Sequence, residues 1–297
     1  MPRKTTKDFP ADIWPLFDSY VHGASTRRDF LERASKLAIG GMAAAELLDA
    51  LSPRFAEAQI VAQSDPRIDA RYVGFDSPRG YGAGRGYIVH PAQPGGKKRP
   101  AILVVHENRG LNPHIEDIAR RLAIEGFIAF APDALFPLGG YPGDEDKARD
   151  LFPKLDQEKT RNDFIAAAQL LRTLPDGNGK VGAVGFCYGG GVVNFLATHL
   201  PELDAAVPFY GAQPPAEEVP RIKAPLLIHY AGADERVNAG WPPYEAALKA
   251  AHVPYQAFIY EGVQHGFNND TTPRYDEAAA RLAWRRTIDF FTKTLRA

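Results

Sequence analysis

The sequence is poor in the residues that crosslink a fold or anchor it in a membrane. It contains a single cysteine among 297 residues, which excludes an intramolecular disulfide and a thiolate cage for zinc. No apolar run approaches the roughly 20 residues that a membrane-spanning helix needs, so we expect no stable membrane insertion. Cys187 is therefore either part of the core or a nucleophile.

An excess of charge of either sign is also missing. The 35 Lys and Arg residues face 36 Asp and Glu residues, which leaves a formal net charge of -1. Such a chain has no basic surplus with which to neutralise a phosphate backbone, so nucleic acid is not expected as a partner. A hydrophobic fraction of 45% and a charged fraction of 24% are typical of soluble globular proteins and exclude a disordered chain.

The first sixty residues differ from the rest because they lack strand signals. The stretch from Ser25 to Leu31 holds an arginine pair and is followed by a mildly apolar segment from Leu37 to Leu48. This arrangement resembles a twin-arginine export signal. Ala56-Glu57-Ala58 has the small-residue pattern that signal peptidases cut, which would make Gln59 the new terminus and place the protein in the periplasm.

An alternative interpretation of this segment stays open, because Glu46 and Asp49 interrupt the apolar stretch. Two amphipathic helices, near Ala11 to His22 and Thr26 to Leu51, would then be retained and packed on the main domain of a cytoplasmic protein. Thr26 is a suitable N-cap for the second helix. Retained helices would also leave room for a role in docking or in a homo-oligomer.

From Arg71 onward, short β-rich runs alternate with helical stretches, which is the pattern of a mostly parallel sheet covered on both faces. We therefore predict an α/β domain over residues 61–297 and a helical or signal-like segment over 1–60. Two runs, Tyr72 to Phe75 and Gly86 to His90, are expected to pair as an antiparallel lead-in. Later strands are expected at 101–105, 127–130, 180–186, 205–210, 225–230 and 255–260. Helices are expected at 112–125, 163–174 and 276–295, with another that starts near residue 190.

The strongest local motif is GFCYGGG, from Gly185 to Gly191, between a Val-rich strand and a helix. It has the form of a nucleophile elbow in which Cys187 stands in the serine position. A residue on so sharp a turn needs small neighbours, which the glycines at 185, 189 and 190 provide. A phosphate-binding loop would need a Gly-Lys-Ser or Gly-Lys-Thr sequence, and no lysine follows here. The dipole of the following helix favours the thiolate.

The partners of a nucleophile elbow follow it in the chain, each on a loop after a later strand. Asp234 comes directly after the predicted strand at 225–230, and His265 follows the strand at 255–260. Because active sites in parallel sheets form at the carboxyl ends of the strands, we predict that Asp234 and His265 meet Cys187. His229 falls inside a strand and is expected to be a core histidine.

The loop after the first buried parallel strand reads His106-Glu107-Asn108-Arg109-Gly110. In this type of fold that loop contributes one oxyanion donor, so the backbone N–H groups of Tyr188 and Asn108 are predicted to hold the developing oxyanion. Glu107 is either a solvated loop acid or a carboxylate that accepts the proton of the thiol and so modulates Cys187.

These motifs give the chain from about Arg71 to Ala297 a resemblance to the dienelactone hydrolase family of α/β-hydrolases. In that family a cysteine replaces the serine of the elbow, and a glutamate holds the resting thiol until substrate displaces it. Gly185-Phe186-Cys187-Tyr188-Gly189-Gly190 and Val104-Val105-His106-Glu107 are similar to the two family motifs. Phe209-Tyr210-Gly211 is similar to a segment that lines the family's pocket.

The resemblance implies an enzyme that cleaves a small carboxylic ester or lactone through a thioester on Cys187, like a carboxymethylenebutenolidase, without a metal or an organic cofactor. Members that act on the carboxylated lactone hold its carboxylate with an arginine shortly after the catalytic histidine, and this chain has none before Arg274. The predicted pocket residues are Arg109, Phe136, Tyr141, Tyr210 and Trp241. Acyl transfer by the same triad, or ligand binding without catalysis, remain alternatives.

Overall fold

The computed structural model describes residues 4–37, 43–92 and 98–296, and its centre is one eight-stranded sheet. The strands lie in the order β1-β2-β4-β3-β5-β6-β7-β8, and all neighbours from β4 to β8 are parallel. The strands are β1 (Ile68–Ser77), β2 (Gly82–Pro91), β3 (Arg99–Val105), β4 (Ile128–Pro132), β5 (Gly177–Phe186), β6 (Ala205–Phe209), β7 (Leu226–Ala231) and β8 (Tyr255–Tyr260). This is the predicted α/β-hydrolase architecture.

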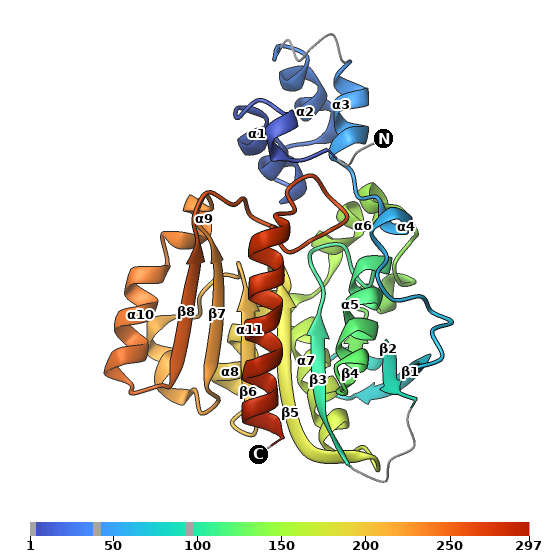
Figure 1. Cartoon of the computed structure of the whole chain (residues 1–297), viewed down its shortest axis with the longest axis vertical. Helices are drawn as coiled ribbons and strands as arrows, with labels where there is room; N and C mark the ends of the chain where they lie inside the picture. The colour runs from blue at the N-terminus through green and yellow to red at the C-terminus, as the bar shows by residue number, and fades with distance from the viewer. Residues whose placement is uncertain (1–3, 38–42, 93–97, 297) are drawn as a thin grey trace.

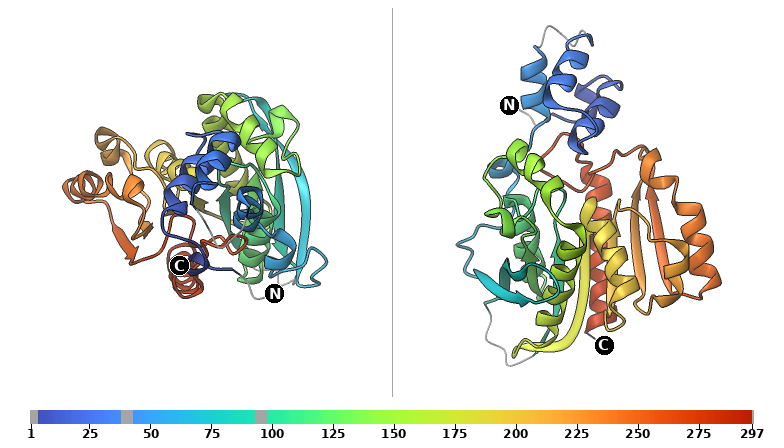
Figure 2. Two further views of the ribbon diagram at one scale, coloured as in Figure 1. Left: turned by 90° about the horizontal axis from the view of Figure 1, so that it is seen from above. Right: turned by 180° about the vertical axis from the view of Figure 1, so that it is seen from behind.

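Helices cover both faces of the sheet, as the near-continuous apolar strands require. Seen in Figure 1, α5 (Pro113–Ile124) and α11 (Glu277–Leu295) lie in front of the sheet. Seen from behind in Figure 2, the opposite face carries α7 (Gln157–Arg172), α8 (Tyr188–His199) and α10 (Trp241–Ala250). Each face has its own cluster of buried apolar side chains.

The sequence predicted the strands more accurately than the smaller helices. The antiparallel lead-in is confirmed as β1 and β2, which pair over ten residues. The helix predicted to start at residue 163 begins at Gln157, where Asp156 caps the N-terminus with its side chain. Three helices were not predicted from the sequence: α6 (Glu145–Leu151), α9 (Glu235–Asn238) and α10. In α10 the second and third residues are prolines, which conceal the start of the helix although proline is well tolerated there.

The N-terminal segment forms a small helical unit above the carboxyl ends of the strands (Figure 1). It consists of α1 (Ile13–Val21), α2 (Arg27–Ala34) and α3 (Ala44–Leu51), and the short α4 (Phe55–Ala58) that follows lies against α5 of the main domain. Thr26 caps α2 as expected, and its hydroxyl accepts a hydrogen bond from the backbone N–H of Asp29. The helix expected from Thr26 to Leu51 is thus two helices, and residues 38–42 of the apolar stretch lie outside the described residues.

The unit is held together by its own apolar core. Phe17, Tyr20 and Phe30 pack ring against ring, and ten side chains of the unit are buried together. Within the described residues, none of the helices combines the length and the apolar character that a bilayer crossing needs.

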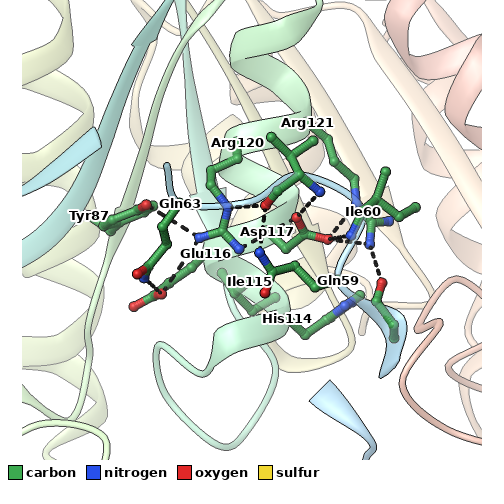
Figure 3. A network of polar contacts seen from close by, with 12 residues as sticks. Gln59, Ile60, Gln63, Tyr87, His114, Ile115, Glu116, Asp117, Arg120 and Arg121 are labelled. Carbon is green, nitrogen blue, oxygen red and sulfur yellow. Dashed lines mark hydrogen bonds and ion pairs between the residues drawn. The ribbon is translucent and has the colours of Figure 1, made fainter. Parts of the chain in front are cut away.

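The segment that joins this unit to β1 is fastened to α5 by buried charged groups (Figure 3). The Asp117 carboxylate accepts hydrogen bonds from the backbone N–H groups of Ile60 and Val61, at 3.0 and 2.9 Å. Arg121 donates to the same carboxylate at 2.6 Å, and Arg120 donates to the carbonyl of Val61 at 2.7 Å. Since Asp117 is almost fully buried, its charge depends on these partners.

Replacing Asp117 by alanine is expected to lower the free energy of unfolding by about 3 kcal/mol, because two guanidinium groups would lose one of their buried counterions and two backbone N–H groups would lose their acceptor. Asp69 serves as the matched control, because its carboxylate is 64% exposed beside Arg71, and Asp69→Ala should cost less than about 0.5 kcal/mol. Urea unfolding of the two variants measures the difference. Equal destabilisation by both would contradict the role given to Asp117.

Candidate active site

Cys187 lies at the turn between β5 and α8, where the backbone adopts a conformation that side chains rarely occupy. Its φ is 55° and its ψ is -113°, which is the strained strand-to-helix turn predicted for the elbow. The carbonyl of Phe209 on β6 accepts the backbone N–H of Cys187 at 3.1 Å. The thiol is thereby presented at the carboxyl end of the sheet and at the N-terminus of α8.

The glycines around Cys187 are required by close backbone contacts. A Cβ on Gly189 would lie 2.2 Å from the carbonyl oxygen of Val105, and a Cβ on Gly185 would lie 2.2 Å from that of Gly189. Val105 also pairs with Gly185 across β3 and β5. The elbow and the loop after β3 are therefore pressed against each other, which brings the Glu107 and Asn108 loop beside the thiol.

Asp234 and His265 meet as the sequence predicted, each directly after its strand. The Nδ1 of His265 lies 2.5 Å from Oδ2 of Asp234, and both side chains are buried. Asp234 also accepts the backbone N–H of Val237. The contact between His265 and Asp234 leaves the Nε2 of the imidazole on the side of the thiol. One ligand atom each of Cys187, His265 and His22 lies within 4.8 Å of the other two.

His22 of the N-terminal unit is the residue that sequence analysis missed. Its Nε2 lies 3.5 Å from the Sγ of Cys187, and its ring stands edge-on to the ring of His265 at 5.0 Å. The sequence contains only a weak signal for this role, an Asp18 four residues earlier on the same helix. Such spacing places two side chains on one helix face but does not show what that face contacts.

Several contacts hold His22 in the site. Its Nδ1 donates to the backbone carbonyl of Asp18 at 2.8 Å and lies 3.3 Å from the Asp18 carboxylate. Arg274, on the loop after His265, pairs with the same carboxylate at 3.2 Å. The carbonyl of Val21 accepts hydrogen bonds from the side chains of Asn108 and Arg109, both at 3.0 Å. The tip of α1 is therefore bound to both loops that flank the thiol.

The electrostatics of this cluster favour a thiolate. Burial by itself raises the pKa of Cys187, but the imidazoles of His265 and His22 outweigh burial and lower the pKa to about 6. Burial likewise disfavours a charged His22, yet Asp18 and Cys187 raise its pKa to about 10. The pKa of His265 is also raised, against burial, by Cys187 and Asp234. An imidazolium next to a thiolate is the expected resting arrangement.

Glu107 lies in the loop predicted for it, and its recorded side-chain hydrogen bond comes from Asn269 at 2.9 Å. The hydrogen bond of the thiol, in contrast, involves His22. His106 is buried with Nε2 accepting the backbone N–H of Ala134. His229 is a core histidine in β7, because it is buried between Thr287 and Tyr260 and its pKa is lowered to about 3 by burial.

A cavity of about 550 Å³ opens beside the thiol. Its wall includes Cys187, Tyr188, Asn108, His265 and Tyr210 from the predicted set, together with His22, Arg161, Gln213 and Arg236. The Tyr210 ring lies 5.0 Å from the ring of His265.

The described lining of this cavity does not include the other four predicted pocket residues. Arg109 is buried, with its guanidinium bound to backbone carbonyls and 3.9 Å from Glu145. Tyr141 donates to the same Glu145, Phe136 begins a short 3-10 helix, and Trp241 packs on Tyr230.

The strand-turn-helix presentation of Cys187, with an Asp–His pair after β7 and β8, defines an α/β-hydrolase. The model of the "Dienelactone hydrolase family" matches residues 85–295, and the chain belongs to this family of hydrolases. A second model, "YqhI-like", matches residues 1–38. This second match includes α1 and α2 of the helical unit and does not overlap the hydrolase match.

Individual relatives agree with the family. The "Putative carboxymethylenebutenolidase" of Saccharolobus solfataricus is 31% identical over 245 residues, which cover 70% of this chain and 93% of that protein. The "Putative hydrolase fragment YghX" of Escherichia coli is 54% identical over 115 residues, which cover 39% of this chain and 97% of that protein. A crystal structure titled as a putative dienelactone hydrolase from Klebsiella pneumoniae aligns with a TM-score of 0.67 at 26% identity and covers 76% of this chain and 99% of that one.

Replacing His22 by asparagine is expected to raise the pKa of Cys187 from about 6, by about one pH unit, because one of the two neighbouring imidazoles is lost. The rate of alkylation by iodoacetamide is proportional to the fraction of Cys187 that is thiolate, so it should be half-maximal near the thiol pKa and constant well above it. The pH profile of alkylation in the variant should shift upward. The control is His252→Asn at an exposed histidine, and an unshifted profile for His22→Asn would contradict the assignment.

Proposed function

We propose that the protein hydrolyses a carboxylic ester or lactone through a thioester on Cys187, with His265 as acid and base and Asp234 as its partner. The observation that supports this most directly is the 2.5 Å contact of His265 with Asp234 beside a thiol held on a strained elbow. The membership in a hydrolase family whose relatives carry the name carboxymethylenebutenolidase supports the same reaction.

In the first half of the cycle, the Cys187 thiolate attacks the substrate carbonyl carbon, and the carbonyl π bond becomes an oxyanion. The backbone N–H groups of Tyr188 and Asn108 are the proposed donors to this oxyanion, and each such donor is worth about 3 to 4 kcal/mol by analogy with donor removals in other enzymes. When the oxyanion collapses, the bond to the alcohol or enolate oxygen breaks. The leaving oxygen takes a proton from the His265 imidazolium.

In the second half, the now neutral His265 removes a proton from water, and the resulting hydroxide attacks the thioester. Collapse of this second tetrahedral species releases the carboxylic acid and the Cys187 thiolate. Asp234 keeps the imidazole in one tautomer and stabilises its charged form. His22 lies beside the general base, with its ring 5.0 Å from that of His265, and the cycle uses His22 to hold the thiolate.

The cavity favours a small substrate with a negative charge. Arg161 reaches it from α7, with its guanidinium 5.0 Å above the Phe195 ring, and Arg236 reaches it from α9. Arg236 also lies 3.8 Å from Asp18, whereas Arg161 forms no ion pair with a carboxylate of the described chain. We therefore assign the carboxylate of the substrate to Arg161.

Export through a twin-arginine route, and with it the periplasmic location, stays a prediction of the sequence. Arg27, the first arginine of the pair, binds Asp146 of α6 at 2.6 Å, and α1 binds the loops beside the thiol. These contacts support the alternative in which the N-terminal helices are retained in the working enzyme.

Replacing Cys187 by alanine should abolish the hydrolysis of p-nitrophenyl acetate, because no other side chain on the elbow can form the acyl intermediate. Acid-quenched intact-mass measurement should show one acetyl group on the parent enzyme and none on the variant. Circular dichroism of the variant checks that it is folded. Turnover equal to that of the parent would reject the cysteine mechanism.

Replacing Arg161 by methionine should raise KM for a carboxylated lactone roughly tenfold, the equivalent of about 1.4 kcal/mol, and leave kcat nearly unchanged. The KM for uncharged p-nitrophenyl acetate should stay the same, because that ester has no carboxylate. Arg281→Met, at an exposed arginine paired with Glu277, is the matched control. A similar loss with both substrates would argue against carboxylate recognition.

A further inference from the structure

Three metal-binding atoms converge at the active site: the thiol of Cys187 and the Nε2 atoms of His22 and His265. We propose that they form a site for a zinc-like divalent ion, and that the ion reversibly blocks the hydrolytic reaction. The positions of the three side chains support the metal site, and only its blocking effect rests on the proposed function. The N-terminal unit supplies one of the three ligands.

The spacing of the donors suits a tetrahedral ion. Bond lengths of about 2.3 Å to sulfur and about 2.0 Å to nitrogen place two ligand atoms about 3.5 Å apart across a tetrahedral zinc. The Sγ of Cys187 and the Nε2 of His22 are already 3.5 Å apart. The remaining pairs lie within 4.8 Å, so small rotations of the two imidazoles bring them to the required distance.

Each imidazole contacts an aspartate through its Nδ1, which leaves its Nε2 for the metal. His265 is held at Nδ1 by Asp234 at 2.5 Å, and His22 by Asp18 through its carbonyl at 2.8 Å and its carboxylate at 3.3 Å. Such outer carboxylates fix the tautomer and raise the basicity of a histidine ligand. The Nε2 of His265 is buried and has no hydrogen-bond partner among the described residues. That atom binds a metal once its proton has left, so metal binding releases the protons of the two imidazoles.

The donor set determines which ion fits. One thiolate and two imidazoles favour zinc and cobalt over magnesium and calcium, which prefer oxygen ligands. The charge of a divalent ion is offset by the thiolate and by the carboxylates of Asp18 and Asp234. Arg236 opposes binding, because its guanidinium lies 3.2 Å from the Nε2 of His22. Its side chain is 53% exposed, so it can turn toward solvent.

The bound ion would have three protein ligands and an open fourth position toward the 550 Å³ cavity. A water molecule or an anion can complete the tetrahedron there. The sulfur lone pair that attacks the carbonyl would be engaged in the bond to the metal, and the Nε2 of His265 could no longer accept a proton. Both catalytic atoms are occupied at once, which predicts full and reversible loss of hydrolysis.

The test is a titration of the metal-free full-length protein with cobalt(II), followed by visible and near-ultraviolet absorbance. We expect one equivalent to produce tetrahedral cobalt bands and a thiolate-to-cobalt charge-transfer band, and zinc(II) to remove both. His22→Asn should weaken cobalt binding by at least the roughly 10- to 100-fold that loss of an outer-shell partner costs, because a direct ligand is removed, whereas His252→Asn should bind like the parent. Cys187→Ala, as a second variant, should lose the charge-transfer band.

The outcomes separate the site from the proposed reaction. Absence of tetrahedral bands in the parent, or equal cobalt affinity in the His22→Asn and His252→Asn variants, would overturn the metal site. Hydrolysis of esters by the metal-free parent is measured separately, so a protein that binds cobalt but never hydrolyses would refute only the proposed function. Hydrolysis that persists at saturating zinc would refute the block, and recovery of activity on chelation would support it.

Discussion

The active site depends on the close approach of two backbone segments. Gly189 lies directly against the carbonyl of Val105, so the elbow after β5 and the loop after β3 share one edge of the sheet. This contact sets the strained backbone of Cys187 and brings Asn108 to the wall of the cavity. A side chain at the glycine position would push the two segments apart, and the thiol would leave the His265 imidazole.

The second organising feature is that the catalytic domain does not enclose its own site. His22, at the end of α1, lies 3.5 Å from the thiol, and Asp18 joins this helix to Arg274 on the loop that carries His265. The two family models match separate parts of the chain, residues 1–38 and 85–295, yet side chains from both parts are combined around one sulfur atom. Chemistry at Cys187 is thus controlled by residues more than 150 positions away in the chain.

The parts of this site that were predictable from the sequence are those that follow from local pattern. A glycine-rich turn after an apolar strand identified Cys187, and the positions of Asp234 and His265 after two later strands followed from the order of the chain. Arg109 and Trp241 were predicted as pocket residues, but their side chains contact Glu145 and Tyr230. His22 has only the weak signal of Asp18 four residues earlier and Arg161 has none, since their roles arise from how distant helices pack, which periodicity does not encode.

Two buried side chains depend on the backbone carbonyl of Val21 as a hydrogen-bond acceptor. The Asn108 amide and the Arg109 guanidinium both donate to this single oxygen, and Arg109 is only 7% exposed. Loss of α1 would therefore expose two side-chain donors that are positioned to bind a peptide carbonyl oxygen. A donor left without its acceptor in such a place costs about 1 to 3 kcal/mol, so the entrance would favour any ligand that offers an oxygen in the same position.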